Sequence, residues 1–191
     1  MPATKTIITL DEFLALPDDG VERWVKDGIL YESQSGADMS RRSREHCNAM
    51  GRVAQILNNW NDEQSPPRGK VYPGDAGVVL KNGELVTYGI DVAWLDAARL
   101  AQQSDEATTI INGAPNLAVE ILSPSNLHGE LTDKIRALLE YGTQEVWVLD
   151  TYWKVVDVYK TGSPKECYQN DRRLQSPILT GFSVPAAKFF D

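Results

Sequence analysis

Two short, almost wholly apolar runs separated by a helical pattern constrain the fold more than any other feature of the sequence. Residues 117–122 and 146–149 read LAVEIL and VWVL, and each has the length and composition of a buried strand. Between them, apolar residues at helical spacing predict a helix that ends at Gly142. Since a helix is the usual crossover between parallel strands, the segment predicts an α/β fold with a parallel strand pair.

Two short elements are predicted near the start of the chain. Residues 9–16 begin with a threonine, carry acids in the first turn and stop before Pro17, which is typical of a capped helix. The Asp27–Gly28 pair lies between strand-forming residues 23–26 and 29–32. This arrangement predicts a β-hairpin, because Asp-Gly suits the tight turn between two strands.

The longest predicted helix covers residues 45–60, and an antiparallel strand pair follows it. One face of the helix carries side chains that suit burial and recur every three or four residues: His46, Met50, Val53, Leu57 and Trp60. Residues 71–80 and 84–95 then predict two strands joined by a turn at Asn82–Gly83.

The last quarter of the chain predicts one more strand and a loop-rich tail. Residues 155–159 alternate enough to form a strand beside residues 146–149. The tail from Gly162 is expected to be loop-rich, with the apolar residues 186–190 packing back on the body. Because no internal repeat and no second domain is visible, residues 1–191 are expected to form a single domain.

The composition is that of a globular protein, and its charge excludes one class of function. With 42% hydrophobic residues the chain can bury a proper core. Its formal net charge of −8 argues against a protein that coats nucleic acid non-specifically, because such binding needs many contacts from lysine and arginine to phosphates. Within this acidic chain, four arginines form a local basic group: Arg41, Arg42, Arg44 and Arg52. They suit either phosphate contacts or a solvated face.

The sequence predicts a cytoplasmic protein. No stretch approaches the roughly 18 consecutive apolar residues needed to span a bilayer, and the first residues lead into no signal-like apolar segment. Cys47 and Cys167 have no CxxC spacing and no nearby paired histidines. They are therefore expected to be free thiols and not a disulfide or zinc ligands.

Two acids in otherwise apolar strands are the main candidate site residues: Asp91 within residues 89–94 and Glu120 within residues 117–122. A buried carboxylate is costly unless something pairs it, and for either acid alone a salt bridge or an exposed sheet edge is the simpler explanation. If the two strands are neighbours, both acids can face one point. Mg²⁺ or Mn²⁺ prefers carboxylate ligands of this kind, so the pair predicts a metal site.

Lys134 is the third candidate, on the helix that follows the strand of Glu120. A crossover helix packs over the sheet, so the lysine ammonium can reach the carboxylates and help to orient or activate a water molecule. Spacing alone favours another role, in which Lys134 is a solvated helix residue paired with Glu130 four residues earlier.

The residues around these candidates resemble one known family. The matching segments are GIDVA at 89–93, AVEILSPS at 118–125, Asp133-Lys134, Tyr141-Gly142 and VWVLD at 146–150. They look like the putative restriction endonuclease family of bacteria, within the PD-(D/E)xK nuclease superfamily. The similarity extends from the DEFLALP opening at residues 11–17 to Tyr159.

The resemblance implies a restriction-endonuclease-like fold, with a three-layer α/β/α core, a mixed central sheet, an N-terminal helix and a β-hairpin. It also implies Mg²⁺-dependent hydrolysis of phosphodiester bonds that leaves a 5′-phosphate. The active site carried over by the resemblance consists of Asp91, Glu120 and Lys134, with Asp91 and Glu120 as the metal ligands.

This chain departs from the family pattern at two positions. Ile90 stands where a proline usually precedes the first acid, and Trp24 stands where many relatives carry a glutamate. The auxiliary contact of that glutamate is therefore lost or taken over by Glu22 or Glu32. His46 coincides with a family histidine at the start of the long helix and is a candidate for supporting the site.

Three functions follow from these observations. The first is a Mg²⁺-dependent endonuclease that acts on nucleic acid, with DNA as the expected substrate and a homodimer as the expected assembly, since symmetric dimers are commonest. The second is a nuclease fold that has lost activity and serves as a binding or assembly module. The third is a metallohydrolase for a phosphorylated small molecule, which would suit the net charge of −8.

Overall fold

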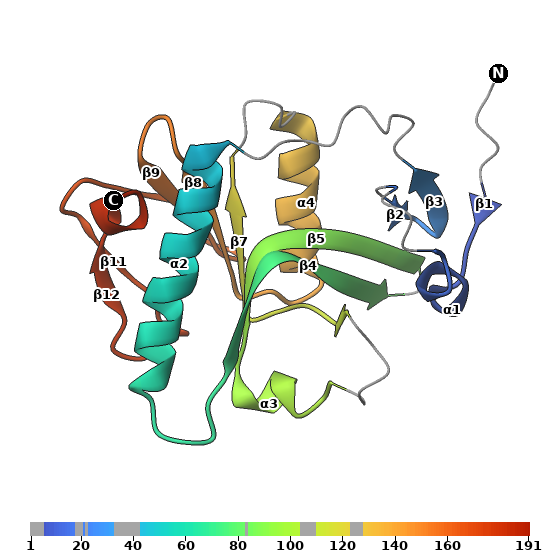
Figure 1. Cartoon of the computed structure of the whole chain (residues 1–191), viewed down its shortest axis with the longest axis horizontal. Helices are drawn as coiled ribbons and strands as arrows, with labels where there is room; N and C mark the ends of the chain where they lie inside the picture. Colours follow the sequence, from blue (N-terminus) through green and yellow to red (C-terminus); the bar gives the residue numbers. More distant parts are fainter. Residues whose placement is uncertain are drawn as a thin grey trace.

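A mixed seven-stranded sheet with a helix on each face organises the chain (Figure 1). The computed structural model describes residues 6–17, 21, 23–32, 43–82, 84–103, 110–122 and 128–191. The sheet has the strand order β10-β9-β8-β7-β5-β4-β6. Its strands are β4 (Lys70–Asn82), β5 (Glu84–Leu95), β6 (Ile111–Asn112), β7 (Leu117–Ile121), β8 (Glu145–Asp150), β9 (Val155–Tyr159) and β10 (Glu166–Gln169).

The helices and the smaller sheets surround this core. The helices are α1 (Leu10–Leu14), α2 (Arg44–Asp62), α3 (Ala97–Leu100), α4 (His128–Glu140) and the 3-10 helix η1 (Ala186–Phe189). Two small sheets are formed by β1 (Thr6–Ile7), β2 (Arg23–Lys26) and β3 (Ile29–Glu32), and by β11 (Arg173–Gln175) and β12 (Ser183–Pro185).

The predicted strand, helix and strand at the centre are confirmed. β7 and β8 pair in parallel, and α4 connects them as the crossover helix. β5 lies on the other side of β7 and runs antiparallel to it, so the strands that carry Asp91 and Glu120 are neighbours, which is the condition for both acids to face one point. All five residues of β7 are buried, because helices cover both faces of the sheet at this point.

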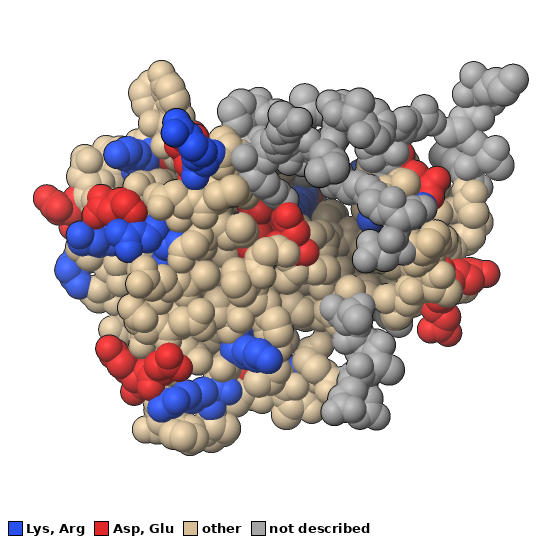
Figure 2. Space-filling view, viewed as in Figure 1, with Lys and Arg blue, Asp and Glu red and all other residues tan. Residues whose placement is uncertain are grey.

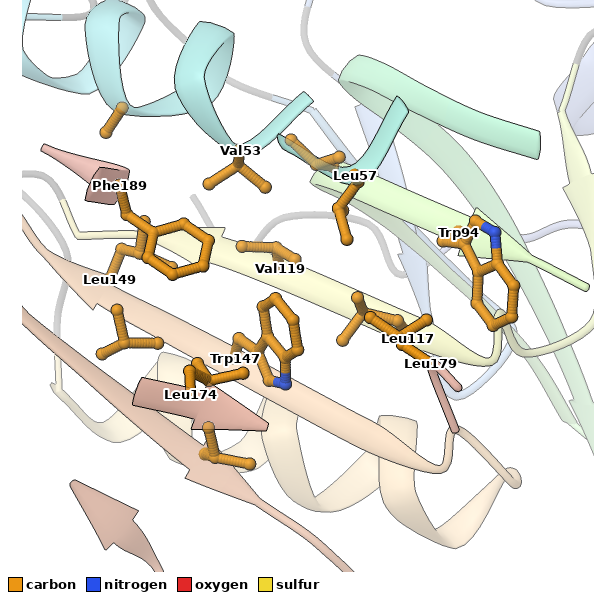
Figure 3. Close-up of a cluster of buried hydrophobic side chains, with 14 of the residues drawn as sticks. Val53, Leu57, Trp94, Leu117, Val119, Trp147, Leu149, Leu174, Leu179 and Phe189 are labelled. Carbon is orange, nitrogen blue, oxygen red and sulfur yellow. The ribbon is translucent and has the colours of Figure 1, made fainter. Parts of the chain in front are cut away.

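Two apolar clusters, one on each face of the sheet, make the structure three-layered. On one face, Val53 and Leu57 of α2 point towards Val119 and Trp147 of the sheet (Figure 3). On the other face, Leu138 of α4 packs in a cluster with residues of β5, β7 and β8. The three-layer α/β/α core expected from the sequence is therefore present.

The N-terminal helix and hairpin form as predicted, and the hairpin attaches to β5. Thr9 caps α1 through a reciprocal capping box with Glu12. Asp27 and Gly28 both have positive φ, of 53° and 72°, as the tight hairpin turn requires. The hairpin is held on β5 because the main-chain N–H of Val25 donates to the hydroxyl of Thr87 at 2.7 Å.

The tail after Gly162 is rich in loops, as predicted, but it also contains short strands that the sequence did not indicate. β10 extends the main sheet as its edge strand, and β11 and β12 form a two-stranded sheet. These strands have only three or four residues, too few to show a clear alternation in the sequence. The expected packing of the last apolar segment is confirmed, since Ala186 and Phe189 are buried in the cluster beneath α2.

Candidate active site

The candidate site lies where β5 separates from β7. The two strands pair from Trp94 opposite Leu117 to Val92 opposite Val119, and Asp91 is the next residue of β5. Asp91 is only 3% exposed, and its Oδ2 accepts a hydrogen bond from the main-chain N–H of Ile121 at 2.7 Å. The carboxylate therefore takes the place of a strand-to-strand hydrogen bond and is fixed at the point of separation.

A β-bulge in β4 lies opposite this point. The pairing of β4 with β5 shifts register between Pro73 and Ala76, so β4 has an extra residue there. A bulge increases the local bend and twist of a strand pair. Both strands curve away from β7 in this region (Figure 1).

His46 supports Asp91 from the first turn of α2. Ser43 caps this helix by accepting a hydrogen bond from the main-chain N–H of His46 at 3.1 Å. The side chain of His46 is fully buried, and its Nε2 lies 3.1 Å from Oδ1 of Asp91. The two oxygens of Asp91 are thus held by separate elements, α2 and β7. The sequence indicated His46 as a supporting residue, and the structure brings it to Asp91.

Glu120 and Lys134 form the second half of the site. Glu120 is 8% exposed, and its Oε2 lies 2.7 Å from Nζ of Lys134. The same ammonium donates to the main-chain carbonyl of Gly89 in β5 at 2.6 Å. Oε1 of Glu120 is buried and has no hydrogen-bond partner among the residues that the structure describes.

The pairing of Lys134 differs from what spacing alone favours. Spacing indicated Glu130 as the partner, whereas the ammonium contacts Glu120 across the layer between α4 and β7. The side chain of Glu130 lies outside the described part of the chain. Sequence spacing finds partners on one helix but not partners that a crossover helix brings onto the sheet beneath it.

Burial dominates the electrostatics of Glu120. Removal from water raises the pKa of Glu120 to about 7, although the nearby Lys134 ammonium opposes the rise. The negative charges of Asp91 and Asp75 add to the rise in pKa. Glu120 therefore binds a proton more readily than an ordinary glutamate, and a cation near Oε1 would favour its ionised form.

Asp75 is a site residue that the sequence analysis missed. It lies in the bulge of β4 with a positive φ of 55°, and its charge acts on Glu120. A Cβ atom added to Gly89, whose carbonyl binds Lys134, would lie 3.9 Å from Cβ of Asp75. The signal was the Pro-Gly-Asp sequence at residues 73–75, since such residues inside a strand indicate a bulge.

The hairpin position at which relatives carry a glutamate has another role here. Trp24 stacks on Tyr31 across the hairpin, with ring centroids 5.7 Å apart. Of the two acids expected to take over the auxiliary contact, Glu32 is bound by Arg23 at 2.7 Å and Glu22 lies outside the described residues. The structure therefore shows no replacement for the family glutamate among the described hairpin residues.

The other residues singled out in the sequence lie around this site or at the surface. The side chain of Arg44 is almost fully exposed, and Arg52 donates to the main-chain oxygen of Asp191. Arg41 and Arg42 lie outside the described residues. Both cysteines are free, as predicted, and both are exposed. None of the described helices is long and apolar enough to span a membrane.

The donor set at the site suits a hard divalent cation. Among the described residues, no three His, Cys, Asp or Glu side chains form a group that could hold a metal ion. Mg²⁺ does not need such a group, because one or two carboxylates commonly bind it together with water and substrate phosphates. Asp91, together with Glu120 and its unpartnered Oε1, fits this requirement.

Comparisons with known proteins agree with this geometry. The family model Uma2, described as "Putative restriction endonuclease", matches residues 10–187. No curated protein sequence matches the chain. The crystal structure of a putative nuclease belonging to DUF820 from Anabaena variabilis ATCC 29413 is similar, with a TM-score of 0.75 and 21% sequence identity over 96% of this chain and 97% of that chain.

The two comparisons carry different weight. At 21% identity the structural likeness shows the fold alone, and this fold is the restriction-endonuclease-like nuclease fold that the sequence indicated. The family match, by contrast, extends over almost the entire chain and includes every candidate site residue. The chain therefore belongs to the Uma2 family of putative restriction endonucleases.

Proposed function

We propose that the chain is a metal-dependent endonuclease that hydrolyses phosphodiester bonds in nucleic acid, with DNA as the expected substrate. Asp91 and Glu120 would hold Mg²⁺ or Mn²⁺, and Lys134 would position the attacking water. The main support for the proposal is the environment of the Glu120 carboxylate. It is a buried carboxylate beside Asp91, with one oxygen bound to a lysine and the other without a partner.

Asp91 is suited to remain in place during a reaction. The N–H of Ile121 and the ring of His46 hold its two oxygens from different directions. A carboxylate fixed in this way needs little reorganisation when a cation or substrate arrives. Glu120 complements it, because Oε1 is the one oxygen of its carboxylate that Lys134 leaves available.

The chemistry divides between the cation and Lys134. When bound, Mg²⁺ lowers the pKa of a coordinated water and stabilises negative charge on the phosphate. Lys134 is held by Glu120 and by the carbonyl of Gly89, so its ammonium stays beside the carboxylates. From there it can orient the attacking water and stabilise the charge that develops on the phosphate.

The first experiment is Mn²⁺ calorimetry on the wild type and the Asp91→Ala/Glu120→Ala variant. A matched control is Asp62→Ala/Glu63→Ala, which removes two exposed acids from the end of α2. We expect binding by the wild type and the control and none by the site variant. Cleavage of labelled DNA and RNA oligonucleotides should follow the same pattern, and sedimentation tests the expected homodimer.

Two results would contradict this proposal. If the wild type binds no Mn²⁺ even with a phosphorothioate oligonucleotide present to supply a phosphate ligand, the binding or assembly module is favoured. If it hydrolyses bis(p-nitrophenyl) phosphate but no oligonucleotide, it is the small-molecule metallohydrolase. Circular dichroism of each variant shows whether a lost activity reflects the site or the fold.

A further inference from the structure

Two aromatic side chains project from the turn between β8 and β9. Tyr152 is 82% exposed and Trp153 is 71% exposed, and their rings meet edge to face with centroids 4.9 Å apart. Figure 2 shows an uncharged protrusion over this turn, at the upper left. Tyrosine and tryptophan carry large apolar surfaces, so an adjacent pair this exposed has the character of a binding element.

The turn holds the aromatic pair outward in a defined way. Oδ1 of Asp150 accepts hydrogen bonds from the main-chain N–H groups of both Tyr152 and Trp153, at 2.9 Å each. Lys154 follows with a left-handed φ of 52°. An aspartate that binds the main chain of the next residues stabilises a turn. The exposure of the two rings is therefore built into the hairpin.

This turn lies at the same edge of the sheet as the candidate active site. β7 and β8 are parallel, and Glu120 lies opposite Val148. Both strands point towards the edge where the aromatic turn and the start of α2 are found (Figure 1). β8 ends at Asp150, two residues beyond Val148, so the turn begins on the order of 10 Å from Glu120.

Cations connect the turn with α2. Lys188, Arg52 and Lys154 all lower the pKa of Asp191, with Lys188 contributing most. Arg52 of α2 also binds the main-chain oxygen of Asp191. The first turn of that helix supplies His46 to the site. Lys154 of the turn and Arg52 of α2 thus both act on Asp191, whose negative charge they share with Lys188.

We propose that Tyr152, Trp153, Lys154 and Arg52 form a surface, here called the aromatic turn surface, that binds a single-stranded part of a nucleic acid substrate. The inference rests on the proposed function and adds the form of the substrate. Bases would stack on the two rings, and backbone phosphates would lie near the two cations. Single-stranded bases are favoured because the faces of bases in a duplex are already covered by their neighbours.

The net charge of the chain supports this mode of binding. At −8 the chain has little general attraction for a polyanion, and Figure 2 shows acidic and basic side chains interspersed and no continuous basic surface. Stacking supplies affinity that depends less on charge. An aromatic anchor beside a few local cations therefore suits an acidic protein that must retain a nucleic acid strand.

The test is the affinity of the full chain for a labelled single-stranded oligonucleotide, measured by fluorescence anisotropy in EDTA to prevent metal-dependent cleavage. We expect Tyr152→Ala/Trp153→Ala to bind at least about fivefold more weakly for each ring removed. The matched control Tyr152→Phe/Trp153→Phe keeps both aromatic faces and should bind within about twofold of the wild type. Neither change should affect turnover of bis(p-nitrophenyl) phosphate, which is too small to reach the turn.

Three results would overturn the inference. The first is equal oligonucleotide affinity in the wild type and the alanine variant, and the second is tighter binding of duplex than of single strands through the same residues. The third is an alanine variant that loses binding to anionic lipid vesicles but keeps its affinity for the oligonucleotide. The proposed function is judged separately. Its failure would show in the wild type as a loss of Mn²⁺ binding or of oligonucleotide cleavage, whereas failure of this inference leaves both of these intact.

Discussion

Nζ of Lys134 lies 2.7 Å from Oε2 of Glu120, so a helix on one face of the sheet neutralises a buried carboxylate of the central strand. The ammonium binds only one of the two oxygens, and it is itself anchored by the carbonyl of Gly89. The pair is therefore an incomplete ion pair, in which the lysine lowers the cost of burying the glutamate and leaves one oxygen available for a ligand.

Replacing Lys134 by methionine tests the role of the ammonium. The charge of Lys134 lowers the pKa of Glu120, so removing this charge should shift the acidic limb of the pH–rate profile to higher pH. We also expect the maximal rate of cleavage to fall about a hundredfold or more, because charge on the phosphate loses a stabilising cation. Arg136→Met, on the exposed face of the same helix, is the control and should leave both quantities unchanged. An unshifted profile with a full rate would contradict the assigned role.

Replacing Asp75 by asparagine should move the same limb in the opposite direction. The charge of Asp75 raises the pKa of Glu120, so its loss lets Glu120 ionise at lower pH. Asparagine tolerates the left-handed conformation found at this position, so the bulge should be retained. The measurement is cleavage as a function of pH, with the exposed Asp62→Asn as control. A shift to higher pH would mean that Asp75 acts on the site by another route.

The raised pKa of Glu120 also predicts how stability depends on pH without metal. The pKa is about 7 in the folded chain against an ordinary value of 4.5, so the folded state binds more protons between these values. The contribution of Glu120 to stability therefore falls by about 3 kcal/mol as the pH rises from 4.5 to 7, at 1.36 kcal/mol per pKa unit. Above pH 7 this contribution stays constant.

The Glu120→Gln variant isolates this effect, because glutamine does not titrate. Urea unfolding in EDTA at pH 5 and pH 8 should show the wild type losing about 3 kcal/mol relative to the variant as the pH rises. Other titrating groups contribute equally to both proteins and cancel in the difference. If the two proteins lose stability in parallel, Glu120 titrates normally in the folded chain.

The sequence predicted the elements that depend on local pattern. The buried runs of β7 and β8, the long amphipathic helix α2 and the Asp27–Gly28 hairpin are specified by residues near one another in the chain, and all of them form. The short strands β10, β11 and β12 were missed because three or four residues carry too little pattern. Their existence depends on partners far away in the sequence.

The site was predictable only in part, for a similar reason. Acids inside apolar strands made Asp91 and Glu120 candidates, whereas spacing alone favoured a solvated role for Lys134 and only the family resemblance implied a place for it in the site. Asp75 was not recognised from the sequence, because its importance comes from a bulge that brings it next to Gly89 on the neighbouring strand. The hydrogen bond from the N–H of Ile121 to Asp91 could not be predicted from the sequence either, since it depends on where two strands separate.

The contact of His46 with Asp91 can be tested apart from cleavage. His46 holds Oδ1 of Asp91 from α2, so we classify it as a positioning residue. Groups that orient a metal ligand typically contribute about 10-fold to 100-fold in metal affinity. His46→Ala should therefore weaken Mn²⁺ binding within that range, and His46→Gln, which can still donate to a carboxylate, should recover part of it. The neighbouring exposed Cys47→Ser is the control and should bind as the wild type does. If His46→Ala lowers only the melting temperature and leaves Mn²⁺ affinity unchanged, the histidine serves packing and Asp91 is held adequately by the N–H of Ile121.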